Sequence, residues 1–183
     1  MIRVVVTGSE CTGKTTLAAA LAGTYATTWV PEFARRFVRD TGTPPTCDDV
    51  DAIARGQIRL EDERSTAAAT APVLVQDTDL LSSIVYSRHY FGDCPAWIEE
   101  TFRRRVPDLY LLADIDVPWV ADDSQRDRPD RRGEMQALFR DALVARGLTF
   151  ADVRGTLDKR LAIARSAVDE RCCGRGRDRT SVD

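Results

Sequence analysis

The sequence predicts a three-layer α/β fold, in which a five-stranded parallel β-sheet lies between two layers of helices. Three observations support this prediction: five short apolar segments recur along the chain, helical patterns lie between them, and the apolar segments are continuous rather than alternating. Continuous apolar segments are typical of strands that are buried on both faces of a parallel sheet. Strands that alternate with helices form such a sheet through right-handed crossovers.

The predicted strands occupy the five apolar segments. They are Ile2–Val6, Thr28–Val30, Val73–Val75, Leu109–Ala113 and Leu148–Val153. Between them, apolar residues recur every three or four positions, which is the spacing of one helix face. These faces are Leu17, Ala20, Leu21 and Thr24; Val50, Ile53, Ala54, Gln57 and Ile58; Met135, Leu138, Phe139 and Ala142; and Leu157, Leu161, Ala164 and Val168. A further helix is expected to begin near Leu80.

A chain of 183 residues suffices for one domain. We expect that domain over residues 1–171, with a strongly polar segment at about 116–133 that interrupts the pattern. Residues 172–183 lack apolar periodicity, which predicts a disordered tail.

The charge balance argues against a nucleic-acid partner. The chain has 26 Lys and Arg residues against 29 Asp and Glu residues, whereas binding to phosphates needs a basic excess. No apolar stretch approaches the roughly 18 residues of a membrane span, and no signal peptide is recognisable. A single histidine, His89, and the lack of a CxxC pair argue against a zinc site. We expect a cytoplasmic protein with a small-molecule substrate and no membrane insertion; the sequence does not indicate its oligomeric state.

The segment from Gly8 to Thr15 reads GSECTGKT and satisfies the phosphate-loop pattern G-x-x-x-x-G-K-[ST]. It follows a predicted strand and precedes a predicted helix, as the chemistry requires, because backbone N–H groups and the helix N-terminus then face phosphate oxygens. Lys14 is expected to reach the β- and γ-phosphates, and the Thr15 hydroxyl to bind Mg²⁺. The pattern therefore predicts a site for ATP and Mg²⁺. Its nucleotide-binding residues would be Gly8, Ser9, Glu10, Cys11, Thr12, Gly13, Lys14, Thr15 and Thr16.

Among P-loop proteins, a small-molecule kinase fits best. A GTPase should carry DxxG some 40–60 residues after the loop and a later N-K-x-D. The DxxG at Asp152–Gly155 lies near the end of the chain, and no N-K-x-D follows. A motor or helicase would need a larger or oligomeric assembly.

A kinase also needs carboxylates near the γ-phosphate to orient or deprotonate the acceptor hydroxyl. Glu32 follows the second predicted strand, and Asp77 and Asp79 follow the third. Asp77 is the first choice for orienting the acceptor hydroxyl or for holding a Mg²⁺-bound water, and Glu32 is the second choice. As alternatives, Asp79 caps the helix that follows, and Glu32 complements a helix dipole.

The polar segment at about 116–133 lies after the fourth predicted strand, where a lid is expected. Its arginines Arg126, Arg128 and Arg132 are candidates to stabilise charge on the transferring phosphoryl group. Such a charged run is otherwise a solvated loop.

Five stretches together resemble a known family. They are GSECTGKTTL (8–17), WVPEFARRF (29–37), IARGQ (53–57), QDTDLLSSIVYSRHYFG (76–92) and DLYLLADIDVPWVADD (108–123). In order and spacing they resemble the ribosylnicotinamide kinase domain of bacterial NadR-type proteins, from Ile2 to about Glu170. The resemblance implies a nucleotide-kinase-like P-loop fold that phosphorylates the 5′-hydroxyl of nicotinamide riboside with ATP, giving nicotinamide mononucleotide.

The resemblance also guides the choice of acceptor-binding residues. The candidates are Glu32, Phe33, Arg36, Asp77, Asp79, Tyr86 and Trp119; the aromatic ones could stack on a nicotinamide ring or simply pack. The chain starts at the P-loop strand, so we expect neither the adenylyltransferase nor the DNA-binding domain of multifunctional members. It lacks the lid glycine of the family's D-G-x-R pattern, having Asp123–Arg126 instead. Alternatives are a kinase for another nucleoside or a vitamin alcohol such as thiamine, and a non-catalytic ATP-binding regulatory module.

Overall fold

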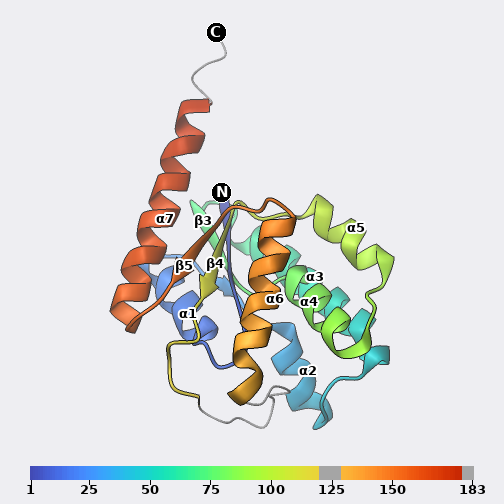
Figure 1. Ribbon diagram of the computed structural model, residues 1–183. Coiled ribbons are helices and arrows are strands. Elements are labelled where there is room, and N and C mark those ends of the chain that lie inside the picture. The colour runs from blue at the N-terminus through green and yellow to red at the C-terminus, as the bar shows by residue number, and fades with distance from the viewer. Residues whose placement is uncertain (120–128, 179–183) are drawn as a thin grey trace.

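The computed structural model, which describes residues 1–119 and 129–178, contains one five-stranded parallel sheet in the order β2-β3-β1-β4-β5 (Figure 1). The prediction of a five-stranded parallel sheet is confirmed. The strands are β1 (Ile2–Thr7), β2 (Trp29–Val30), β3 (Val73–Asp77), β4 (Leu109–Ala113) and β5 (Phe150–Val153). The central strand β1 pairs with β3 on one side and β4 on the other, and Val6 is in register with Asp77.

Helices cover both faces of the sheet and enclose two apolar clusters (Figure 1). Residues of α1 (Lys14–Thr24) and α7 (Leu157–Asp178) form the first cluster with one face of the sheet. The second cluster lies on the other face and contains residues of α3 (Val50–Ala67), α4 (Leu80–Phe91), α5 (Ala96–Arg104) and α6 (Arg132–Ala145). The short helix α2 (Phe33–Thr41) packs on α3, and 3₁₀ turns occupy Cys47–Asp49 and Pro129–Arg131.

The C-terminal segment corrects one prediction. Helix α7 continues to Asp178, so the expected disorder from residue 172 is wrong for residues 172–178; residues 179–183 lie outside the described part of the chain. The apolar face of α7 runs on from Ala164 and Val168 to Cys172, which packs against the first cluster. Beyond that contact the helix projects from the body of the molecule (Figure 1).

The fifth strand is shorter than the sequence predicts. It begins at Phe150 rather than Leu148, because the N–H of Leu148 donates to the carbonyl of Leu143 and ends α6. Gly147 takes a positive φ of 60° at this turn, which suits glycine.

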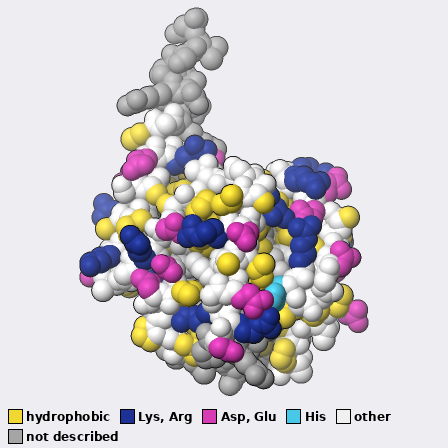
Figure 2. All heavy atoms as spheres, in the orientation of Figure 1, with side chains coloured by type: hydrophobic (Ala, Val, Ile, Leu, Met, Phe, Trp, Pro, Cys, Tyr) yellow, Lys and Arg dark blue, Asp and Glu magenta, His cyan; other side chains and the backbone are white. Residues whose placement is uncertain are grey.

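No helix in the described residues is both long enough and apolar enough to cross a membrane. On the face shown in Figure 2, basic and acidic side chains are interspersed.

Candidate active site

The phosphate loop joins β1 to α1, and its shape depends on two glycines. Gly8 has φ 129°, and a Cβ atom there would lie 2.8 Å from the carbonyl oxygen of Ala113. Gly13 precedes α1 with φ 76°. Both positions require glycine, because other residues rarely adopt such backbone angles. The loop therefore has the curled backbone that a phosphate cradle needs.

Two side chains of the loop turn back onto its own backbone. The Nζ atom of Lys14 donates to the carbonyl of Ser9 at 2.7 Å, and the Thr12 hydroxyl donates to the same carbonyl at 2.8 Å. Lys14 is buried, and it also lines the pocket next to the loop. Its ammonium group is thus held where the terminal phosphates of a nucleotide would lie.

The side chains of Thr15, at the end of the phosphate loop, and Asp77, at the end of β3, contact each other. The Thr15 hydroxyl donates to Oδ2 of Asp77 at 2.5 Å, while Oδ1 of Asp77 has no hydrogen-bond partner among the described residues. Asp77 is only 1% exposed. Burial, and next the negative charge of Glu32, raise the pKa of Asp77 to about 6, against the lowering effect of Lys14. A hydroxyl and a carboxylate with a free oxygen are the oxygen donors that Mg²⁺ prefers, so the pair fits the ion.

The negative charge of Glu32 contributes to the raised pKa of Asp77. Glu32 precedes α2, lines the pocket and accepts a hydrogen bond from Nε of Arg35 at 3.0 Å. No side-chain capping bond from Glu32 to the start of α2 forms, so its carboxylate is directed elsewhere. Of the two acids Glu32 lines the pocket, whereas Asp77 is buried next to Thr78 of the pocket wall. Both remain candidate groups for orienting a hydroxyl.

Asp79 has a different environment, although it is only two residues from Asp77. Its Oδ1 accepts from the N–H of Leu81 at 3.0 Å and its Oδ2 from the hydroxyl of Tyr110 at 2.5 Å. Burial raises its pKa to about 6, and both hydrogen bonds oppose that rise. Asp79 therefore caps α4, which is the alternative that the sequence left open, although it also lines the pocket. Thr78 between the two acids has φ 67°, a strained angle for a β-branched residue.

The pocket lies between the phosphate loop and helices α2, α3 and α4. Its walls include Glu10 and Lys14 of the loop, Ile53 and Gln57 of α3, and Tyr86 of α4. The pocket thus combines charged groups from the loop with apolar and amide groups from the helices. This combination suits an acceptor with a ring at one part and a hydroxyl at another.

Four predicted acceptor residues do not line this pocket: Asp77, Phe33, Arg36 and Trp119. The Phe33 ring packs over Gly56, where a Cβ atom would lie 2.3 Å from the ring. Arg36 pairs with Asp40 on the surface, with Nε and Oδ2 at 3.4 Å. Trp119 lies under the guanidinium group of Arg132, 5.5 Å from the ring centroid. Tyr86 does line the pocket, while its ring also contacts Phe139 edge-on.

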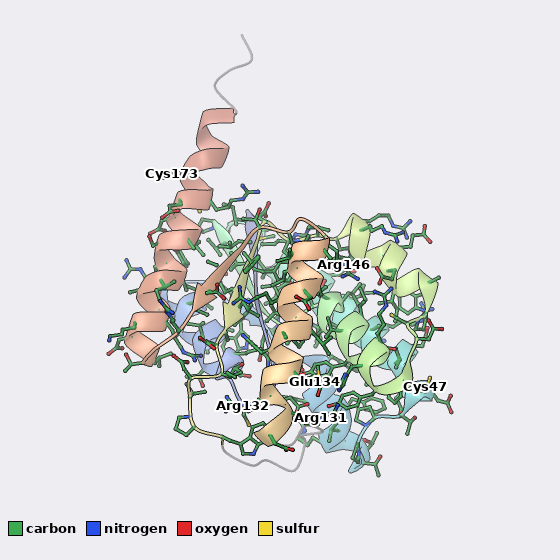
Figure 3. The ribbon with its side chains drawn as sticks, in the orientation of Figure 1. Cys47, Arg131, Arg132, Glu134, Arg146 and Cys173 are labelled. Atoms are coloured by element: carbon green, nitrogen blue, oxygen red, sulfur yellow. The ribbon has the colours of Figure 1, made fainter. Side chains whose placement is uncertain are left out.

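Arg132 is the one predicted lid arginine that falls among the described residues; Arg126 and Arg128 lie outside them. It lies at the N-terminal end of α6, beside Arg131 and close to Glu134 (Figure 3). Its guanidinium group donates to the carbonyls of Cys11 and Val117, each at 3.1 Å. Arg132 therefore links the phosphate loop, through the carbonyl of Cys11, to the segment that contains Val117.

Two further residues support the loop and were missed by the sequence analysis. Arg160 of α7 is 2% exposed and donates to the carbonyls of Thr12 at 2.5 Å and Asp114 at 2.8 Å. Gln136 of α6 accepts from the N–H of Ser9 at 3.1 Å and donates to the carbonyl of Ala113 at 3.0 Å. No local signal marks these residues, because they reach the loop from distant helices.

The fold and the loop together define a P-loop protein with the fold of the P-loop kinases. Residues 3–160 match the profile of a family described as an AAA domain, and the chain belongs to this family. None of the curated protein sequences matches the chain significantly.

Solved structures of two kinds resemble the chain. A NadR protein in complex with NR is 24% identical, with a TM-score of 0.79 over 93% of this chain and 51% of its own. NadR protein in complex with NAD and AMP-PNP is 23% identical, with a TM-score of 0.79 over 93% of this chain and 49% of its own. Deoxyadenosine kinase from M. mycoides with bound dATP is 8% identical, with a TM-score of 0.59 over 92% of this chain and 100% of its own. The chain therefore spans about half of the NadR chains, and its resemblance to them is confirmed in the fold.

Proposed function

We propose that the protein is an ATP-dependent kinase that phosphorylates the 5′-hydroxyl of nicotinamide riboside, giving nicotinamide mononucleotide. The observation that carries this proposal is that Lys14 and Glu32 line one pocket beside the phosphate loop, while Asp77 is buried next to Thr78 of the pocket wall and hydrogen-bonded to Thr15 of the loop. The five family motifs support the choice of acceptor, as does the fold shared with the NadR protein bound to NR.

Each of these residues has its own role in the proposed reaction. The loop backbone and Lys14 bind the nucleotide phosphates, and Thr15 with Asp77 would hold Mg²⁺, which supplies positive charge to the phosphate oxygens. Asp77 or Glu32 orients the acceptor hydroxyl and accepts its proton as the new O–P bond forms and the bond to ADP breaks. The unpartnered Oδ1 of Asp77 favours Asp77 for the contact with the ion or the hydroxyl.

The proposal is tested by a mass-spectrometric kinase assay with ATP, Mg²⁺ and a mixed panel of acceptors. The panel contains nicotinamide riboside, the common nucleosides and deoxynucleosides, and thiamine. Nicotinamide mononucleotide as the main product would support the proposal. A different phosphorylated product would refute the acceptor but keep the kinase, and ATP binding without any product would favour a regulatory module.

A variant links the product to this site. Lys14→Ala should lower turnover by about 10²-fold or more, because the lysine stabilises charge in the transition state. Circular dichroism and thermal unfolding would show that the variant is folded. Wild-type turnover in the folded variant would rule out the assignment of the phosphate loop.

A further inference from the structure

Gln57, a residue of the pocket wall, has a buried hydrogen-bond donor without a partner among the described residues. The residue lies on α3, is 3% exposed and lines the pocket. Its Oε1 accepts from the backbone N–H of Phe33 at 2.9 Å, while its Nε2 has no hydrogen-bond partner within residues 1–119 and 129–178. Buried donors without a partner are rare in folded proteins, so each requires an explanation.

The bond to Phe33 fixes which way the Gln57 amide faces. A backbone N–H can only donate, so the oxygen of the amide must lie on the Phe33 side. The NH₂ group is then on the opposite side, with two N–H donors and no acceptor in the part of the chain that the structure describes. Exchange of the two amide atoms would set donor against donor at Phe33. The environment of Gln57 therefore matches a ligand that brings a hydrogen-bond acceptor.

A second unpartnered polar atom lines the same pocket from the neighbouring helix. Ser82 of α4 is buried, and its Oγ has no hydrogen-bond partner in the described part of the chain. Around these two groups the pocket is lined by apolar or aromatic side chains, including Val50, Ile53 and Phe91. Such walls suit a flat ring, and the polar groups suit a substituent on that ring.

We propose that Gln57, assisted by Ser82, selects acceptors whose base carries a carbonyl oxygen, to which the Gln57 amide donates. This inference rests on the proposed kinase function and adds the group that recognises the base. A carboxamide or a ring carbonyl satisfies the free donor. A base without a carbonyl leaves the buried donor unpaired, and a site with unpaired polar groups discriminates strongly.

The proposal also explains why a glutamine is needed rather than another donor. The same side chain that binds the base holds the first N–H of α2, next to Glu32. The Gln57 amide group thus both binds the base and positions the start of α2 next to Glu32. A substitution that separates these two roles provides the test.

The experiment compares four acceptors with the wild-type protein and with Gln57→Glu. The acceptors are nicotinamide riboside, pyridinium riboside without the carboxamide, uridine and adenosine. A glutamate still accepts from the Phe33 N–H but, when ionised, has no donor for the base. Gln57→Met, which removes both roles, is the second variant. Arg59→Ala, at an exposed position of the same helix, is the matched control, and thermal unfolding shows that each variant is folded.

The wild-type protein should prefer nicotinamide riboside over pyridinium riboside by about 10- to 100-fold in kcat/KM. In Gln57→Glu and Gln57→Met this preference should fall to about threefold or less, whereas Arg59→Ala should keep it. Equal use of the two pyridine ribosides by the wild type, or an unchanged preference in folded Gln57 variants, would overturn the inference and leave the proposed function intact.

The other outcomes separate the two proposals. If uridine is phosphorylated and neither pyridine riboside is, the proposed acceptor is wrong. The Gln57 inference then holds only if the variants lose the preference for uridine over adenosine. A preference for adenosine would overturn the inference, and no phosphorylation of any of the four would overturn both proposals.

Discussion

Replacing Asp79 by Asn should stabilise the protein at pH 8 and have little effect near pH 4. In the folded protein burial raises the pKa of Asp79 from 3.8 to about 6. Protonation of the Asp79 carboxyl therefore stabilises the folded state. This stabilisation is fully present below about pH 3.8 and is lost as the pH rises through about 6. A pKa rise of roughly 2 units corresponds to about 3 kcal/mol at pH 8, most of which develops between pH 4 and pH 8.

The hydrogen bonds of Asp79 determine how much net stability the Asp79→Asn substitution gains. An asparagine oxygen can still accept from the N–H of Leu81, and asparagine is a good N-cap residue. The Tyr110 hydroxyl would have to turn and accept from the new amide, and a weakened bond there costs about 1 kcal/mol. The expected net stabilisation at pH 8 is therefore about 2 kcal/mol.

Urea-induced unfolding followed by circular dichroism, measured without ligand from pH 4 to pH 8, would test this expectation. Asp141→Asn, which removes one exposed negative charge from α6, is the control. A stability difference between Asp79→Asn and wild type that does not change with pH would refute the reasoning. Asp79→Asn that is less stable than wild type at pH 8 would show that the hydrogen bonds to the carboxylate outweigh its burial.

Three other substitutions test the site and its supports. Asp77→Asn should lower kcat by about 10²- to 10⁴-fold in steady-state kinetics, and an effect on nucleotide affinity alone would contradict its assigned role. Gly56→Ala should destabilise by about 1–3 kcal/mol in urea, because the new methyl group meets the Phe33 ring; unchanged stability would show that the ring moves freely. Arg160→Met leaves the buried carbonyl of Thr12 without this donor and should weaken ATP binding about 5- to 100-fold by calorimetry, whereas a wild-type Kd would refute a supporting role.

The sequence predicted the features that depend on local patterns. The five strands were found because burial on both faces of a sheet requires continuous apolar segments. The four patterned helices were found because burial of one helix face places apolar residues at helical spacing. The phosphate loop was found because its glycines and lysine are adjacent in the chain. The end of α7 was missed because one further apolar contact, that of Cys172, sufficed to extend the helix beyond Val168.

The residues that complete the site depend on contacts between distant segments. Arg160 is separated from Thr12 by 148 positions, and Gln136 from Ser9 by 127. In the sequence, Arg160 is one of many arginines and Gln57 is part of an apolar helix face. The position of Phe33 also depends on a distant residue, because its ring packs over Gly56 of α3, where no side chain is in the way.

The pair of Asp77 and Asp79 shows most clearly where sequence reasoning stops. Both follow a buried strand, both are buried in the structure, and burial raises the pKa of each to about 6. Their roles differ because of their partners: Tyr110 and a helix N-terminus occupy both oxygens of Asp79, while Thr15 occupies only one oxygen of Asp77. The left-handed backbone of Thr78 separates the two acids, and such strain persists only where surrounding contacts enforce it. The unpartnered Oδ1 of Asp77 is thus a property of the folded arrangement, and it is the reason why we propose Asp77, rather than Asp79, for the contact with the ion or the hydroxyl.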